Sequence, residues 1–134
     1  MKVLYISHDG ITDHIGKSQV APYLLGLSAF GYEITVLSNE KNLASTSIEE
    51  YKSLFYESKI EWCINSYSNK IPIFSPLITS FRQYLLAKSV CANKGFDIIH
   101  SRCYISTIIG YFLKKSVGNI KLLFDLRDFW IDTR

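Results

Sequence analysis

The sequence predicts an α/β fold, a Rossmann-like doubly wound parallel sheet of about five strands with helices on both faces. Short runs rich in β-branched and other apolar residues alternate along the whole chain with longer segments of helical spacing. Each longer segment can form a helix that returns the chain to the start of the next strand. Strands joined in this way pair in parallel through right-handed crossovers.

The first strand, helix and second strand are predicted over residues 2–7, 18–30 and 33–38. Both strands are short and apolar, as buried strands are. Apolar residues recur at helical spacing through residues 18–30, and Pro22 falls in the first turn, where its missing N–H costs least. Gly31 follows, at the position where a left-handed residue ends a helix.

A capping box predicts where the second helix begins. Ser47 and Glu50 have the spacing at which the serine oxygen accepts an N–H three residues on and the glutamate reaches back. We expect a helix from there to about Lys59, followed by a short third strand over residues 60–64. A loop over residues 66–76, which contains two prolines, separates this strand from the next helix.

The second half of the chain continues the alternation of strands and helices. We predict a helix over residues 77–93 that ends before Gly95, a strand over 96–101, a helix over 106–117 that ends at Gly118, and a fifth strand over 121–125. In the first of these helices one face carries the apolar residues Leu77, Phe81, Leu85 and Val90, with Arg82 and Lys88 elsewhere.

Composition limits the class of protein. The chain has 134 residues, of which 48% are hydrophobic and 20% charged, which suits one folded domain over residues 1–134 and excludes a disordered chain. Its apolar runs are shorter than the roughly 20 residues of a membrane-spanning helix, and its start is too short for a secretory signal. The three cysteines form no C-x-x-C pair, so we expect no zinc site, no disulfide and a cytoplasmic location.

The positive charge is concentrated in the middle of the chain. Between residues 62 and 122, Asp97 is the one acid among eight basic residues. The basic residues Lys70, Arg82, Lys88 and Lys94 have no carboxylate between them. One interpretation is that these residues form a face that contacts phosphates or an anionic membrane, at the inner side of the plasma membrane. The other is that they form an ordinary solvated helix face. Nucleic acid is not expected, because no aromatic stacking positions accompany these residues on the strands.

The loop after the first strand is the first candidate site, since ligands of such sheets bind beyond the carboxyl ends of the strands. It lacks the glycines of a dinucleotide fingerprint. Its end, Gly16-Lys17-Ser18, matches the end of a phosphate-binding P-loop. The spacing differs, however, because a P-loop would need a glycine at Ile11, and Asp13 adds a negative charge inside the loop.

Three sequence blocks resemble the N-terminal domain of family-four retaining glycosyltransferases, in the bacterial branch that builds surface polysaccharides. The blocks are I-G-K-S-Q-V-A-P-Y-L-L-G-L-S-A-F-G-Y-E-I-T-V-L-S at residues 15–38, D-I-I-H-S-R at 97–102 and F-D-L-R-D-F-W at 124–130. These enzymes have the GT-B architecture of two facing Rossmann-like domains. The resemblance therefore implies the N-terminal half of a GT-B fold, with the acceptor site and one wall of the cleft.

The resemblance also implies roles for individual residues. Gly16, Lys17 and Ser18 would approach the donor diphosphate, and Arg127 would lie near the cleft. His100 and Arg102 would be the catalytic residues beside the transferred sugar. The family often has H-x-H here, and a guanidinium in place of the second histidine cannot act as a base, so Arg102 could instead bind a phosphate. Which of His100 and Arg102 contacts the sugar stays open.

The expected substrates are a nucleotide-sugar donor and a lipid-linked or saccharide acceptor, with no metal and no separate cofactor. The family holds its donor mainly in a C-terminal domain, which is absent from these 134 residues. We therefore expect a truncated glycosyltransferase that is inactive without that partner domain. Two alternatives are a stand-alone Rossmann-type module that binds a phosphorylated ligand and a P-loop NTPase.

Overall fold

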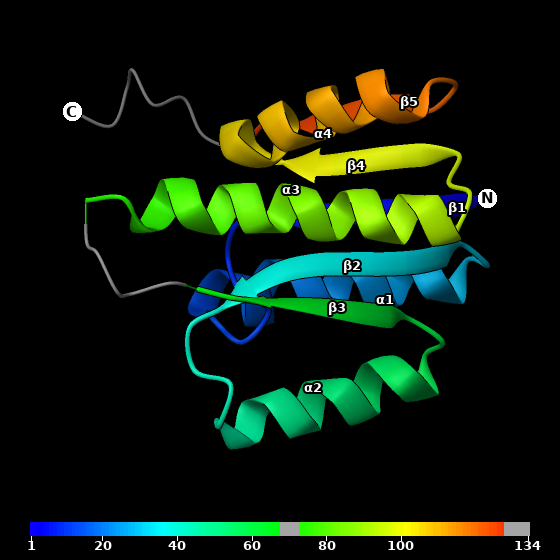
Figure 1. Cartoon of the computed structure of the whole chain (residues 1–134). Helices are drawn as coiled ribbons and strands as arrows, with labels where there is room; N and C mark the ends of the chain where they lie inside the picture. Colours follow the sequence, from blue (N-terminus) through cyan, green and yellow to red (C-terminus); the bar gives the residue numbers. More distant parts are fainter. Residues whose placement is uncertain (68–72, 128–134) are drawn as a thin grey trace.

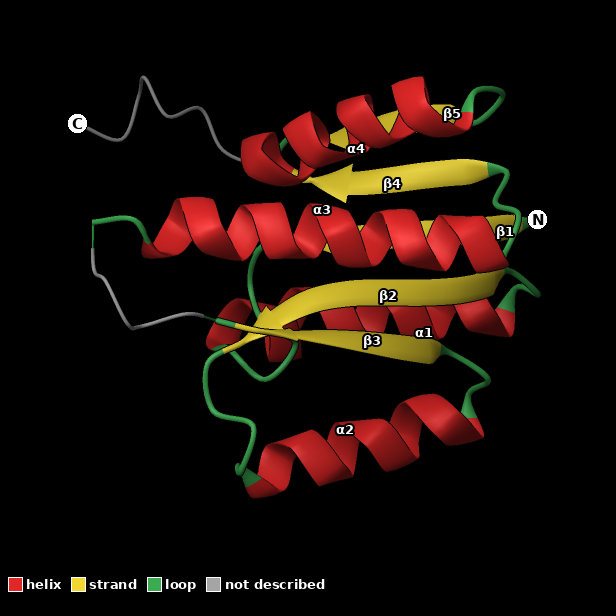
Figure 2. Ribbon diagram, viewed as in Figure 1, coloured by secondary structure: helices red, strands yellow, loops and turns green. Residues whose placement is uncertain are grey.

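A computed structural model describes residues 1–67 and 73–127 and shows a five-stranded parallel sheet with helices on both faces (Figures 1 and 2). The predicted fold class is confirmed. In chain order the elements are β1 (Lys2–Ser7), the π-helical turn η1 (Gly16–Val20), α1 (Ala21–Ala29), β2 (Glu33–Glu40), α2 (Thr46–Glu57), β3 (Glu61–Ser66), α3 (Ser75–Asn93), β4 (Ile98–Arg102), α4 (Cys103–Val117) and β5 (Lys121–Asp125).

The strand order is β3-β2-β1-β4-β5, so the chain leaves β1 toward one edge and later returns to the other side of β1. All four neighbouring pairs are parallel, and Ser7 at the end of β1 lies in register with Arg102 at the end of β4. The point between β1 and β4 is therefore the switch in strand order, where a crevice forms beyond the carboxyl ends of such strands.

Each face of the sheet has its own apolar core. Helices α3 and α4 lie side by side over the face that is nearest the viewer in Figure 1, where Leu4 and Ile6 of β1 pack with Leu113. Tyr5, between them in the sequence, points to the opposite face and packs with Leu24 of α1 and Phe55 of α2. The alternation along β1 shows that the central strand is buried on both sides, as a parallel sheet requires.

Most predicted elements match the structure within a few residues, and the helix starts differ most. The helix predicted to begin at Ser47 begins at Thr46, and Ser45 is its N-cap, with a side chain that accepts a hydrogen bond from the Ser47 N–H. The Ser47 hydroxyl instead accepts a hydrogen bond from Lys17. Helix α4 begins at Cys103, directly after β4 and before the predicted start at residue 106.

Helix α3 buries a different face from the one that its apolar residues suggest. The buried residues are Ser75, Thr79, Gln83 and Ala87, whereas Leu77, Phe81 and Leu85 are exposed. The reason lies in the polar ends of the strands beneath the helix. The Gln83 amide donates to the carbonyl of Ser7 and accepts from Asn39, so the polar stripe is the one that fits this place.

Candidate functional site

Arg102 is a buried cation at the switch in strand order. Arg102 is the last residue of β4 and is only 4% exposed. Its Nη2 donates a hydrogen bond to Gln19 Oε1 at 2.7 Å. Within the described residues its Nε has no hydrogen-bond partner, and no carboxylate lies within ion-pair distance. A buried guanidinium without an acidic partner is costly to desolvate. The position is therefore suited to an anionic ligand.

His100 and Arg127 meet at the carboxylate of Asp125. The His100 Nε2 lies 3.4 Å from Asp125 Oδ2, and the Arg127 Nε donates to the same carboxylate at 2.9 Å. Burial lowers the pKa of His100, and the hydrogen bond to Asp125 opposes that shift. The buried ring is therefore favoured in its neutral form, with Asp125 holding its orientation.

Two tyrosines complete the surroundings of His100. The ring centroids of Tyr5 and His100 are 4.7 Å apart, and Tyr23 of α1 meets the His100 ring edge-on at 5.6 Å. Burial raises the pKa of Tyr5 to about 12, although Arg102 acts in the opposite direction. The Tyr5 hydroxyl makes no hydrogen bond of ordinary geometry among the described residues, but it lies close enough to Arg102 for that guanidinium to lower its pKa.

The three residues at the start of the first helix have different surroundings. Gly16 is buried, and a Cβ there would overlap the carbonyl oxygens of Gly10 and Ile11. Lys17 extends to Ser47 at the start of α2, with 2.9 Å between Nζ and Oγ. Ser18 uses its hydroxyl to donate to the carbonyl of His14. The structure thus leaves Lys17 and Ser18 with partners outside the cluster around Arg102, and Gln19 is the residue of this turn that reaches it.

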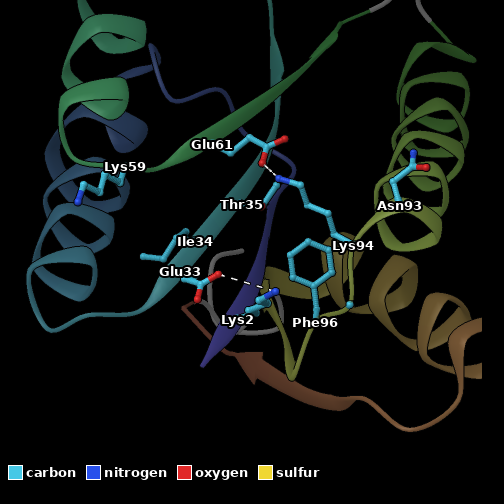
Figure 3. Close-up of a pocket in the computed structure, with 10 residues that line it drawn as sticks. Lys2, Glu33, Ile34, Thr35, Lys59, Glu61, Asn93, Lys94 and Phe96 are labelled. Carbon is cyan, nitrogen blue, oxygen red and sulfur yellow. Dashed lines mark hydrogen bonds and ion pairs between the residues drawn. The ribbon is translucent and has the colours of Figure 1, made fainter.

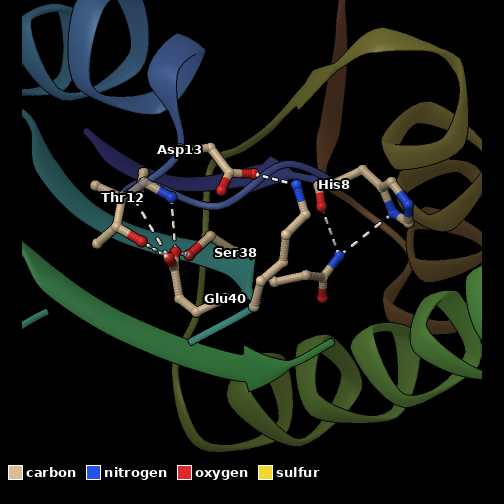
Figure 4. A network of polar contacts seen from close by, with 8 residues as sticks. His8, Thr12, Asp13, Ser38 and Glu40 are labelled. Atoms are coloured by element: carbon tan, nitrogen blue, oxygen red, sulfur yellow. Dashed lines mark hydrogen bonds and ion pairs between the residues drawn. The ribbon is translucent and has the colours of Figure 1, made fainter. Parts of the chain in front are cut away.

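Glu40 organises the first loop from the end of β2 (Figure 4). Its fully buried carboxylate accepts hydrogen bonds from the Ile11 N–H at 2.6 Å, from both the N–H and the hydroxyl of Thr12, and from the Ser38 hydroxyl. In a P-loop the backbone N–H groups of the loop would surround a phosphate. Here the N–H groups of Ile11 and Thr12 are already bound by a carboxylate, which argues against the P-loop interpretation.

Gln19, Tyr5 and Tyr23 are absent from the residues that the sequence predicts for the site. Gln19 and Tyr23 are four residues apart in the segment predicted as one helix, and this spacing is the signal that could have put them on one helical face. Glu40 is at the end of the second predicted strand, where the position of ligand sites in such sheets makes a polar residue a candidate. From the sequence, Tyr5 is predicted only to be a strand residue, because nothing in its sequence surroundings indicates that its hydroxyl lies beside a cation.

Polar cavities elsewhere are less suited to a ligand. A cavity of about 370 Å³ lies at the opposite edge of the sheet, beside the start of β1, β2 and β3 (Figure 3). Two of the three lysines that line it are already paired, Lys2 with Glu33 at 3.9 Å and Lys94 with Glu61. No three His, Cys, Asp or Glu side chains among residues 1–67 and 73–127 converge on a metal-binding position.

The basic residues predicted to form one face are separated. Lys94 is paired at the edge of the sheet just described, and Arg82 donates to the Ser66 hydroxyl. Lys88 is exposed on α3, and Lys70 lies outside the described residues. None of the helices that the structure describes combines the length and the apolar character needed to cross a bilayer.

Comparison with known proteins gives a fold but no family. No family model and no curated protein matches the chain. The C-terminal domain of a hydrogenase from Pyrococcus furiosus is similar in structure, with a TM-score of 0.69 at 14% identity over 93% of this chain and 90% of that domain.

A structure described as a UDP-N-acetylglucosamine 2-epimerase from Listeria monocytogenes is also similar. The TM-score is 0.61 at 15% identity, over 92% of this chain but 30% of the epimerase. The epimerase has a GT-B-like fold. At these identities the likeness concerns the fold alone, and it identifies the chain as an α/β domain of the Rossmann-like class.

Proposed function

We propose that the chain is the acceptor-side N-terminal domain of a glycosyltransferase, which transfers a sugar from a nucleotide-sugar donor to a lipid-linked or saccharide acceptor. The observation that carries the proposal is the buried Arg102 guanidinium without a carboxylate partner in the described part of the chain. The diphosphate of a nucleotide sugar would supply the missing negative charge. The proposal includes a second, donor-binding domain that closes the site.

The chemistry suits the residues at the switch in strand order. A departing nucleoside diphosphate gains negative charge, which N–H donors aimed at it stabilise. In the proposal Arg102 and Arg127 provide those donors, and a phosphate oxygen takes the place of the Gln19 oxygen at Arg102 Nη2. His100, held by Asp125, faces the transferred sugar. The epimerase with a similar fold bears the name of a UDP-sugar enzyme, which is consistent with a sugar nucleotide here.

A stand-alone module that binds a phosphorylated ligand without catalysis is the second candidate. The same guanidinium supports it, because Arg102 has no carboxylate partner in the described part of the chain and any phosphate could supply the negative charge. The two candidates differ in whether the sugar contributes to binding. In a glycosyltransferase domain the residues around His100 would contact the sugar, whereas in a phosphate-binding module they would not.

The test measures binding by NMR with UDP-glucose, UDP-N-acetylglucosamine and inorganic pyrophosphate as probes. The sugar nucleotides should shift the amide signals of Gln19, His100 and Arg102. Arg102→Lys and Arg127→Ala should each weaken binding by roughly 10- to 100-fold, the usual effect of losing a hydrogen bond to a charged group. Arg82→Ala, at an exposed arginine of α3, should leave binding unchanged.

Several results would overturn the proposal. Equal affinity for pyrophosphate and sugar nucleotides would favour the phosphate-binding module. Binding of magnesium ATP that is lost in Lys17→Ala would favour the P-loop NTPase. Sugar-nucleotide binding that survives in both Arg102→Lys and Arg127→Ala would place the ligand elsewhere on the molecule.

A further inference from the structure

The outward surface of α3 and α4 is apolar, although it faces water. Leu77 is 70% exposed and Phe81 61% on α3, and Ile108 is 57% exposed and Phe112 54% on α4. These four side chains line a shallow groove of about 360 Å³ between the two helices. Large contiguous apolar surface of this kind marks a binding surface in most folded proteins.

The exposure follows from how α3 packs. Its polar residues Thr79 and Gln83 are turned inward, where Gln83 binds the Ser7 carbonyl and the Thr79 carbonyl accepts from Asn65. The apolar residues at i, i+4 and i+8, from Leu77 through Phe81 to Leu85, are then forced outward. The helix cannot rotate to bury them without leaving the polar strand ends unsatisfied.

Lysines lie on the same outward surface, toward the end of each helix. Lys88 is at i+7 from Phe81, and Lys115 is at i+7 from Ile108, so each lysine shares a helical face with exposed apolar residues. The Lys115 ammonium lies 4.7 Å from the ring centroid of Tyr111. Neither α3 nor α4 contains an aspartate or a glutamate, and together they carry Arg82, Lys88, Lys114 and Lys115.

We define the α3/α4 face by its outward residues: Leu77, Phe81, Leu85 and Lys88 of α3, with Ile108, Tyr111, Phe112 and Lys115 of α4. We propose that the α3/α4 face docks on the surface of an anionic lipid bilayer. The apolar side chains enter the boundary between headgroups and acyl chains, and the lysines contact lipid phosphates. The proposal does not rest on the sugar-nucleotide site, because no residue of that site contributes to it.

The charge of the α3/α4 face selects this occupant over a second copy of the chain. A dimer through the face would place lysines against lysines, with no carboxylate on either helix to compensate. An anionic bilayer offers both negative charge and an apolar interior. Lysines beside exposed aromatic and aliphatic side chains are the composition of helices that lie in a membrane interface.

Vesicle flotation tests the proposal with the full chain. The chain should float with phosphatidylcholine vesicles that contain phosphatidylglycerol, and added salt should reduce that binding. The double variant Phe81→Ser with Phe112→Ser should reduce the bound fraction at least tenfold, because two large apolar groups no longer enter the bilayer. Lys88→Gln and Lys115→Gln should each weaken binding to anionic vesicles about fivefold and leave binding to pure phosphatidylcholine unchanged.

The controls make the same changes elsewhere. Phe30, at the end of α1, is 85% exposed, and Phe30→Ser should bind like the unaltered chain. Lys52→Gln on α2 is the matched charge control. Circular dichroism should show native helix content in every variant. Failure to float with anionic vesicles would overturn the proposal, as would flotation unaffected by Phe81→Ser with Phe112→Ser. A dimer that dissociates in that double variant, without vesicle binding, would make the α3/α4 face a protein interface instead.

Discussion

Gly16 has no room for a side chain, and this makes it the most informative glycine to replace. A Cβ would overlap the carbonyl oxygens of Gly10 and Ile11, which are fixed backbone atoms of a loop held by Glu40. Gly16→Ala should therefore lower the free energy of unfolding by about 1–3 kcal/mol, the usual cost of overpacking, as measured by urea denaturation.

Gly26 provides the matched control for Gly16. It lies inside α1, and a Cβ there would meet nothing within 4 Å. Gly26→Ala should raise the free energy of unfolding by about 0.5–1 kcal/mol, because alanine favours the helix and restricts the unfolded chain. If Gly16→Ala were equally stabilising, that result would contradict the close approach of the Gly10 and Ile11 carbonyls to Gly16.

His100 should make stability depend on pH below neutrality. Burial lowers its pKa in the folded chain relative to the unfolded value of about 6.5, with Arg102 and Arg127 adding to that shift and Asp125 opposing it. Above about pH 7.5 the ring is neutral in both states, so it contributes no slope. As the pH falls below 6.5 the unfolded chain takes up a proton first, and the free energy of unfolding falls by up to about 1.4 kcal/mol per pH unit.

Urea denaturation between pH 7.5 and 5.5 measures that slope. His100→Gln should show a shallower slope than the unaltered chain, with a remainder from His8, whose pKa is also lowered by burial. An unchanged slope in His100→Gln would mean that the ring is not held neutral in the folded protein.

The start of α2 shows what a local motif can and cannot predict. The S-x-x-E spacing at Ser47 correctly indicated a helix, but Ser45 also has the right chemistry and takes the cap position. Ser45→Ala should lower the free energy of unfolding by about 1 kcal/mol. Ser47→Ala should change it by less than about 0.5 kcal/mol, as for an ordinary surface position. Thermal denaturation of both variants measures the two losses of stability. A larger loss in Ser47→Ala than in Ser45→Ala would show that Ser47 is the N-cap.

The strands were predictable because their apolar runs are bounded by clear turn residues, and the positions of β1, β3 and β5 came within a residue or two of the structure. The buried face of α3 was not predictable, because a prediction from apolar periodicity holds only where the surface beneath the helix is apolar. Here the surface includes the ends of β2 and β3, where Asn39 and Asn65 need hydrogen-bond partners. Only the three-dimensional arrangement shows that Gln83 and Thr79 meet that need.

The candidate site was predictable in its location and less so in its contacts. The order of strands and helices was enough to place His100, Arg102 and Asp125 at one edge of the sheet, because parallel strands all end there. Helical spacing could suggest that Gln19 shares a face with Tyr23, but not that Lys17 extends to α2 or that Gln19 reaches Arg102. Both residues lie in the π-helical turn, where side-chain directions differ from those that α-helical spacing predicts.

The two apolar cores should unfold together, because β1 supplies side chains to both. Leu113 of α4 packs on one face of the sheet with Leu4, whereas Trp62 of β3 packs on the other, with its ring centroid 5.5 Å from that of Phe55. Leu113→Ala should cost about 2–5 kcal/mol, the range for a large apolar residue removed from a core. If the chain unfolds in two states, the same loss of unfolding free energy must be observed at Trp62.

Fluorescence in a Trp130→Phe background, which leaves Trp62 as the only tryptophan, measures this directly. The urea midpoint of Trp62 fluorescence should fall in Leu113→Ala by the same amount as the midpoint of the helical signal, although Trp62 is on the other face of the sheet. If Trp62 kept its original midpoint while helical signal was lost first, α4 and its core would unfold as a separate unit. The continuity of the sheet through β1 favours the coincident result, since Leu4 and Tyr5 cannot leave their respective cores independently.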